Sequence, residues 1–181
     1  MSNDIVGANP TFLTKLKLEN KMNIFYLDTN TKTCAEAHCD KHVVKMILEY
    51  AQLLSTAHRI LDGDEENEEL YKATHKNHPS AVWVRESYDH YHYTFRLFKY
   101  LCAEYTKRYT KVHATSRLLH ALSEAPKNIG IKGFKSPPQC MPDHYKSDDT
   151  VQAYRNYYNI DKAYMCKWKY TQQPKWFQKE D

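Results

Sequence analysis

The chain has 181 residues, a formal net charge of +4, 41% hydrophobic residues and only four glycines, which suits one globular domain. With so few glycines and no G-x-G-x-x-G or Walker-type stretch, a glycine-rich phosphate loop is excluded. No apolar run predicts a membrane span or a signal peptide, and five cysteines without such a signal indicate reduced thiols in a cytoplasmic setting, the host cytoplasm if the chain is viral.

The N-terminal part of the chain is predicted to contain a polar extension, a short extended segment and then the first long helix. Residues 1–21 show little periodicity and are predicted to lie outside the domain, which spans 22–181. Residues 22–28, MNIFYLD, are predicted to be a short extended segment. A single long helix is expected over 33–60, with a T-x-x-E capping box from Thr33 and Glu36.

Two further helices are predicted in the middle of the chain. The acidic stretch 61–69 reads as a loop that enters a short helix near 68–75. The turn Asn77–Ser80 precedes a second long helix over 81–109, with Ser80 as its expected cap.

The C-terminal part contains a shorter helix near 114–123 and then a long Pro- and Gly-rich loop over 126–145. A last helix is expected to begin after Asp149 and to run to about Trp168, with tyrosines on its core face. The fold class is therefore mainly α: one bundle of three long helices and one or two short ones.

A polar stripe runs along the first long helix, whose remaining residues are largely apolar. Its members recur at spacings of four, three, four, three and four, so they share one helical face. They are His38, His42, Lys45, Glu49, Gln52 and Thr56.

A carboxylate in an apolar helix with a cation one turn away suits acid–base work. Glu49, His42 and Lys45 are the predicted catalytic residues, and Glu49 is placed to protonate a leaving group or to stabilise an oxocarbenium-like centre. The alternative is a solvent-facing stripe with a Lys45–Glu49 ion pair. Arg85 either forms part of this pocket together with Glu86, or makes a structural ion pair with Glu49 or with Glu86.

Metal and thiol chemistry have less support. Cys34, His38 and His42 recur every four residues, but no C-x-x-C or H-E-x-x-H is present, so no metal and no cofactor is predicted. Cys102 and Cys140 show no pattern typical of a catalytic thiol.

Positive charge is concentrated in the second half of the chain. Residues 1–90 contain 10 Lys and Arg against 14 Asp and Glu, whereas residues 91–181 contain 16 against 8. A basic half with interleaved aromatic residues indicates a nucleic-acid partner. The side chains expected to bind substrate or DNA are Arg85, His38, Lys107, Arg108, Lys132, Lys135, Arg155, Lys175 and Trp176.

Two stretches resemble the small all-helical phage pyrimidine-dimer DNA glycosylases. One is Asp40-Lys41-His42 followed by Glu49, a D-x-H-x6-E pattern whose glutamate is the catalytic carboxylate in that family. The other is Pro174-Lys175-Trp176-Phe177, similar to a tail that lies near the DNA. The stretches MNIFYLD, HCDKHVVKM and PPQCMPD also resemble uncharacterised phage proteins.

The chain departs from the family pattern at the nucleophile. The family uses the amine of an N-terminal threonine, whereas this chain begins Met1-Ser2 and Met22 is followed by Asn23. Leu48 also stands where the family has an arginine before the glutamate. A lyase step would need another amine, from Lys45 or Lys41.

The resemblance implies an enzyme that acts on double-stranded DNA and cleaves the N-glycosidic bond of a damaged or modified base, with AP-lyase activity as a further step. Two alternatives stay open. One is a phage enzyme that modifies DNA bases or nucleotides, and the other is a non-enzymatic nucleic-acid-binding protein that stacks tyrosines on bases.

Overall fold

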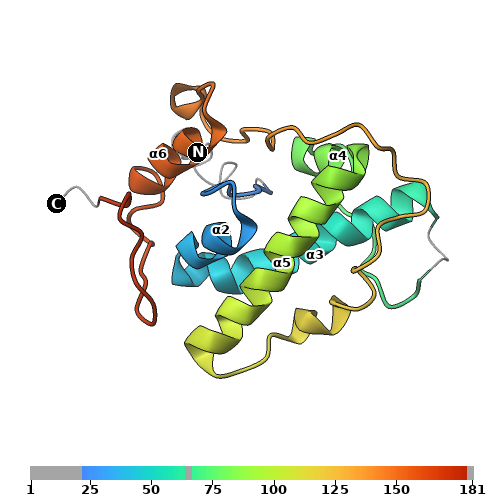
Figure 1. Ribbon diagram of the computed structural model, residues 1–181, viewed down its shortest axis with the longest axis horizontal. Coiled ribbons are helices and arrows are strands. Elements are labelled where there is room, and N and C mark those ends of the chain that lie inside the picture. Colours follow the sequence, from blue (N-terminus) through green and yellow to red (C-terminus); the bar gives the residue numbers. More distant parts are fainter. Residues whose placement is uncertain (1–21, 64–66, 179–181) are drawn as a thin grey trace, which may run out of the picture.

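The computed structural model describes residues 22–63 and 67–178. Its regular elements in these ranges are five α-helices and two short 3-10 helices, without a strand, which confirms the predicted all-α class (Figure 1). Residues 22–28 are extended backbone, as expected. The predicted extension over 1–21 lies outside the described residues.

The predicted helix over 33–60 is two helices, α2 (Thr31–Ala37) and α3 (Asp40–Leu61). The predicted T-x-x-E box is also wrong, because the side chain of Asn30 caps α2 by accepting from the backbone N–H groups of Lys32 and Thr33.

The break between α2 and α3 is imposed by distant side chains. His38 and Cys39 are extended, so the carbonyl groups at the end of α2 lack helical partners. Arg108 donates to the carbonyl oxygens of Glu36 and His38, and Trp168 Nε1 donates to that of Ala37. These bonds come from later parts of the chain, so local periodicity could not reveal them.

The predicted helix over 81–109 is likewise two helices, α4 (Pro79–Glu86) and α5 (Tyr88–Tyr109). At the break, the N–H of Tyr88 donates to the carbonyl of Gly130 at 2.8 Å, and the hydroxyl of Ser87 accepts from the N–H of Lys132 at 3.1 Å. The predicted cap at Ser80 is wrong, because the side chain of His78 caps α4.

The predicted short helix near 68–75 is absent. Arg59 donates to the carbonyl oxygens of Leu70 and Tyr71, and the hydroxyl of Thr56 exchanges hydrogen bonds with the backbone of Thr74. These hydrogen bonds hold residues 70–74 against the end of α3 in place of a helix.

The C-terminal helices are shorter than predicted. Instead of a helix over 114–123 there is a 3-10 helix, η1 (Ala114–Leu118), followed by turns. The long loop contains only η2 (Asp143–Tyr145). The last helix, α6 (Thr150–Asn159), is capped by the Asp149 side chain and ends well before Trp168.

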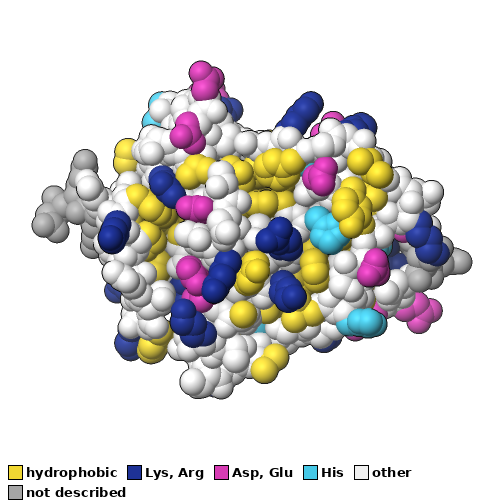
Figure 2. All heavy atoms as spheres, in the orientation of Figure 1, with side chains coloured by type: hydrophobic (Ala, Val, Ile, Leu, Met, Phe, Trp, Pro, Cys, Tyr) yellow, Lys and Arg dark blue, Asp and Glu magenta, His cyan; other side chains and the backbone are white. Residues whose placement is uncertain are grey.

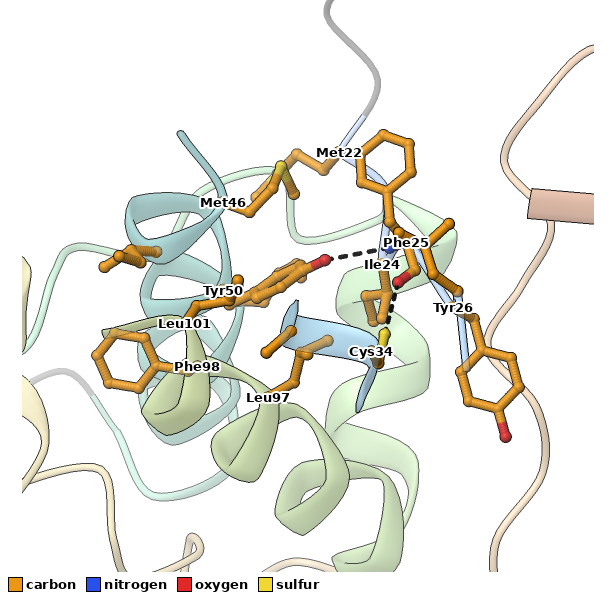
Figure 3. Packing of buried hydrophobic residues seen from close by; sticks show 14 of the residues in the cluster. Met22, Ile24, Phe25, Tyr26, Cys34, Met46, Tyr50, Leu97, Phe98 and Leu101 are labelled. Carbon is orange, nitrogen blue, oxygen red and sulfur yellow. Dashed lines mark hydrogen bonds between the residues drawn. The ribbon is translucent and has the colours of Figure 1, made fainter. Parts of the chain in front are cut away.

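The core lies between the extended segment and the helices. α3 packs on α5 and α4, and α2 packs on α5. Figure 3 shows Tyr50 pointing at the extended segment, where its hydroxyl meets the N–H of Phe25. Three tyrosines of α6 are buried as expected, namely Tyr154, Tyr157 and Tyr158. No helix of the described ranges has the length and apolar character to cross a membrane.

Candidate functional site

The Lys45–Glu49 pair lies on α3 at the edge of the core. Lys45 Nζ is 3.2 Å from Glu49 Oε1, and the carboxyl side chain is only 16% exposed, against 55% for the lysine. Burial raises the pKa of Glu49, and the charge of Lys45, with a smaller contribution from His75, opposes this rise. The carboxyl group therefore holds a proton more readily than an exposed glutamate does.

The sequence of α3 explains this asymmetry. Met46 and Tyr50 lie to one side of Glu49 around the helix axis and are buried, whereas Lys45 and Leu48 lie to its other side and are exposed. Glu49 thus lies at the boundary between the apolar and the solvent-exposed face of α3. A boundary position leaves its carboxyl group accessible while removing most of its hydration.

His42 lies deeper than the other predicted catalytic residues. Its ring packs on Phe25 with the ring centres 4.3 Å apart, and its Nδ1 makes a short hydrogen bond to the hydroxyl of Tyr158. Burial lowers the pKa of His42 well below its usual value, with further lowering from nearby positive charges. His42 is therefore a neutral group of the core that links α3 to α6.

His38 belongs to a closed ring of hydrogen bonds. Its Nδ1 donates to the carbonyl of Cys34 at 2.7 Å, which leaves Nε2 to accept from the hydroxyl of Tyr50 at 3.2 Å. Tyr50 accepts from the N–H of Phe25, and the Cys34 thiol donates to the carbonyl of Phe25 (Figure 3). Burial lowers the pKa of His38 to about 4. This histidine has no exposed surface for DNA.

Arg85 does not pair with Glu49. Its guanidinium donates to the carbonyl of Lys76 at 2.7 Å, and burial lowers its pKa. Its neighbour Glu86 lies 3.9 Å from Lys132 instead. The structural Arg85–Glu49 pair considered from the sequence is therefore wrong.

Four of the predicted DNA-binding residues line one pocket of about 550 Å³ between α2, α5, α6 and the segment 171–176. That volume falls within the range of small-ligand sites. The four are Lys107, Arg155, Lys175 and Trp176.

The positive wall of this pocket is held in place by Arg155. Its guanidinium carbon lies 5.2 Å from the centre of the Trp176 ring, and its nitrogens donate to the carbonyl of Leu27 and to the carboxylate of Asp28. Figure 2 shows Lys and Arg side chains gathered over α5 and the C-terminal segment, with acidic side chains among them. The pocket therefore presents both a cationic and an aromatic surface.

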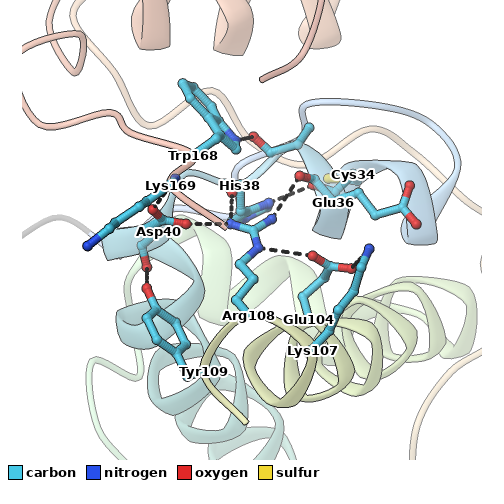
Figure 4. A network of polar contacts seen from close by, with 11 residues as sticks. Cys34, Glu36, His38, Asp40, Glu104, Lys107, Arg108, Tyr109, Trp168 and Lys169 are labelled. Carbon is cyan, nitrogen blue, oxygen red and sulfur yellow. Dashed lines mark hydrogen bonds and ion pairs between the residues drawn. The ribbon is translucent and has the colours of Figure 1, made fainter. Parts of the chain in front are cut away.

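Arg108, the neighbour of Lys107, is placed quite differently. Its side chain has no exposed area and binds the carboxylates of Glu104 and Asp40 at 3.0 and 3.2 Å (Figure 4). It also donates to two carbonyl groups at the end of α2. The Nε, Nη1 and Nη2 atoms of the guanidinium all donate to groups inside the protein, so Arg108 stabilises the fold.

Lys132 and Lys135 lie in the long loop between η1 and η2, which contacts the break between α4 and α5, and they do not line this pocket. Both side chains are exposed. The loop is fixed by its backbone, because the N–H of Lys135 donates to His90 and its carbonyl accepts from Trp83 Nε1.

Sequence reasoning missed the polar partners in the pocket. Asp28, Thr33 and Glu36 line it together with Gln172 and Gln173. The only local signal was the proximity of the two glutamines to the Pro174–Phe177 stretch. Across 22–63 and 67–178, no three His, Cys, Asp or Glu side chains cluster in a way that could hold a metal ion.

The fold and the site define an all-helical protein with a desolvated carboxylate and a separate cationic, aromatic pocket. The sequence model of the pyrimidine dimer DNA glycosylase family matches residues 22–117, which include His42, Lys45 and Glu49. This is more than half of the chain, and the protein belongs to that family. No curated protein and no solved structure matches the chain.

Proposed function

We propose that this protein is a DNA N-glycosylase that cleaves the N-glycosidic bond of a damaged or modified base, with Glu49 as the catalytic carboxylate. The observation that carries the proposal is the state of Glu49: mostly buried, with a raised pKa, and beside Lys45 within the region that the family matches. A surface ion pair would leave both partners hydrated.

Glycosidic cleavage gives Glu49 two tasks. As the base departs, positive charge develops at the sugar C1′, and an ionised carboxylate next to it stabilises that charge. The raised pKa also keeps a larger fraction protonated at mildly acidic pH, which allows proton donation to the leaving base. Lys45 holds the carboxylate in place, and its amine, 3.2 Å from that carboxylate, is a candidate to form an imine with the sugar.

His42 has a positioning role in this proposal. Its hydrogen bond to Tyr158 ties α3 to α6 from within the core, so it fixes the helix that carries Glu49. It does not need to contact the substrate.

DNA binding is assigned to the pocket and its surroundings. Lys107 and Lys175 have exposed ammonium groups for phosphates, and Trp176 offers an aromatic surface that is already stacked with Arg155. Arg85, Lys132 and Lys135 are assigned to outer phosphate contacts. The buried positions of His38 and Arg108 favour a role in the fold instead.

The test is incubation with duplex DNA that carries one thymine dimer or one modified base, followed by alkali treatment and mass analysis of the DNA. We expect release of a base, or cleavage of one glycosidic bond of the dimer, together with an alkali-sensitive site in the DNA. An altered base mass without release would instead show a base-modifying enzyme. Binding with unchanged DNA would show a binding protein.

Adding borohydride to the same reaction identifies any amine nucleophile, because reduction fixes an imine as a stable adduct. The full chain and a chain that begins at Met22 are compared. Peptide mapping then distinguishes Lys45 or Lys41 from an N-terminal amine, and release without an adduct indicates water as the nucleophile.

A further inference from the structure

The segment after α6 is attached to the α2–α3 junction by three hydrogen bonds. The N–H of Asp40 donates to the carbonyl of Lys167 at 2.8 Å, and the N–H of Lys169 donates to the Asp40 carboxylate at 2.8 Å. Trp168 Nε1 donates to the carbonyl of Ala37 at 3.2 Å (Figure 4). The backbones at 37–40 and 166–169 therefore lie side by side.

This arrangement places two cysteines against each other. Cys39 precedes Asp40 and Cys166 precedes Lys167, and the two residues are 0% and 7% exposed. The two thiols are close enough for each to shift the pKa of the other. Among the other cysteines, Cys34 donates to a backbone carbonyl, and Cys140 lies 3.7 Å from the hydroxyl of Ser80.

The two thiols differ in acidity. The interaction with the neighbouring Cys166 thiol lowers the pKa of Cys39, which is also the residue that precedes the first turn of the 22-residue helix α3. The interaction with Cys39, together with burial, raises the pKa of Cys166. A thiolate-prone sulfur with a protonated thiol next to it favours sulfur oxidation followed by disulfide closure once peroxide reaches the buried Cys39.

We propose that Cys39 and Cys166 form a reversible disulfide when the protein meets hydrogen peroxide, independently of any reaction on DNA. The Cys39 thiolate attacks peroxide: an S–O bond forms, the O–O bond breaks, and the departing hydroxide takes up a proton as water. Cys166 then attacks the Cys39 sulfur: the S–S bond forms, the S–O bond breaks, and the thiol proton leaves in a second water. Two thiols are oxidised while one peroxide is reduced.

The disulfide has a structural consequence for the pocket. Lys175 and Trp176 lie in the segment that follows Cys166 and line the pocket with α2. In the reduced protein this segment is attached to the α2–α3 junction by packing and hydrogen bonds alone. A covalent link at Cys166 restrains it against α2 and α3. In a reducing compartment such bonds are transient and serve as redox sensors.

The test uses the full chain, treated with a small excess of hydrogen peroxide and then with an alkylating reagent. The expected product has lost two hydrogens and regains them with dithiothreitol. Tryptic digestion without reduction should join peptide 33–41 to peptide 163–167. Because peptide 33–41 also contains Cys34, fragmentation must place the bond at Cys39.

The variants give a matched set. Cys39→Ser and Cys166→Ser should each abolish the cross-link, whereas Cys34→Ser and Cys102→Ser should retain it. Oxidation should also raise the melting temperature of the unsubstituted chain, because the bond closes a long loop. A cross-link between other cysteines, or oxygen added to cysteine without a cross-link, would overturn the proposal. Both outcomes are measured on the unsubstituted chain, so they do not depend on whether a variant folds.

Discussion

Glu49 and Lys45 are four residues apart and form an ion pair, yet their charged groups differ in exposure to solvent. The lysine keeps most of its contact with water, while the carboxyl group loses most of its own. A net rise in the pKa of Glu49 means that burial outweighs the attraction of Lys45. An ion pair that served stability would lower this pKa, so the pair is not explained as a stabilising surface contact.

This asymmetry predicts that Glu49→Gln stabilises the fold at neutral pH, by on the order of 0.5 kcal/mol. The folded-state pKa is raised, so ionised Glu49 disfavours folding above that pKa. Below the unfolded-state pKa both states hold the proton, and the difference from the glutamine variant should vanish. Urea unfolding at pH 7 and pH 4 measures this. A less stable variant at pH 7 would support the structural ion pair instead.

Arg108 and Lys107 are adjacent in sequence but should respond oppositely to substitution. Arg108→Met removes the buried cation between Glu104 and Asp40, leaves Glu104 with only the exposed Lys107, and should cost about 3–5 kcal/mol. Lys107→Met, in the same helix but with an exposed side chain, should cost less than about 0.5 kcal/mol. Denaturant midpoints of the two variants decide this, and similar losses would contradict the structural role of Arg108.

At the scale of elements, the helical segments were predictable but their breaks were not. Apolar periodicity located α3 and α5 because each presents one long buried face. Neither break has a Gly or Pro at its centre. The residues at the first break are held by Arg108, about 70 positions later, and Ser87 at the second is held by the loop at 130–132. Bonds of that sequence separation leave no local pattern.

The buried histidines that join these elements predict sensitivity to acid. His38 and His42 have lowered pKa values in the folded state, about 4 for His38. Their contribution to stability is therefore complete above the unfolded-state pKa of about 6.5 and is lost as pH falls toward the folded-state values. Each contributes a slope of up to about 1.4 kcal/mol per pH unit in this window.

The check is urea unfolding between pH 7 and pH 5. The unsubstituted protein should lose a few kcal/mol, on the order set by two histidines. His42→Phe should be less stable at pH 7, because Tyr158 loses its partner, but should show a smaller pH dependence, which then comes from His38 and from His58, His90 and His113, whose pKa values are also lowered. A flat profile for the unsubstituted protein would show that these histidines are not held neutral.

At the scale of the whole molecule, the predicted site residues do not meet in one place, and the Lys45–Glu49 pair shares no residue with the C-terminal pocket. The Lys45–Glu49 pair belongs to α3, whereas Lys107, Arg155, Lys175 and Trp176 meet at the C-terminal pocket. The sequence identified these side chains by type and spacing. It could not show that the irregular segment after α6 returns to α2, because such a segment has no periodicity.

Composition also could not separate exposed from buried charges. Lys107 and Arg108 have the same local context, and only the tertiary fold makes one solvent-exposed and the other internal. His38 and His42 shared a helical face with Glu49 in the sequence, but the break after α2 places His38 in the core. The catalytic and DNA-binding roles stay predictions.

The most direct test of the catalytic assignment is the single-turnover rate of glycosidic cleavage on a duplex with one thymine dimer. The full chain, Glu49→Gln and the control Glu69→Gln are compared, since Glu69 is half exposed and pairs only loosely with Arg117. We predict that the full chain cleaves the bond, that Glu49→Gln lowers the rate by about 10²–10⁴-fold, and that Glu69→Gln leaves the rate unchanged. Cleavage by Glu49→Gln at the unsubstituted rate would contradict the assignment of Glu49.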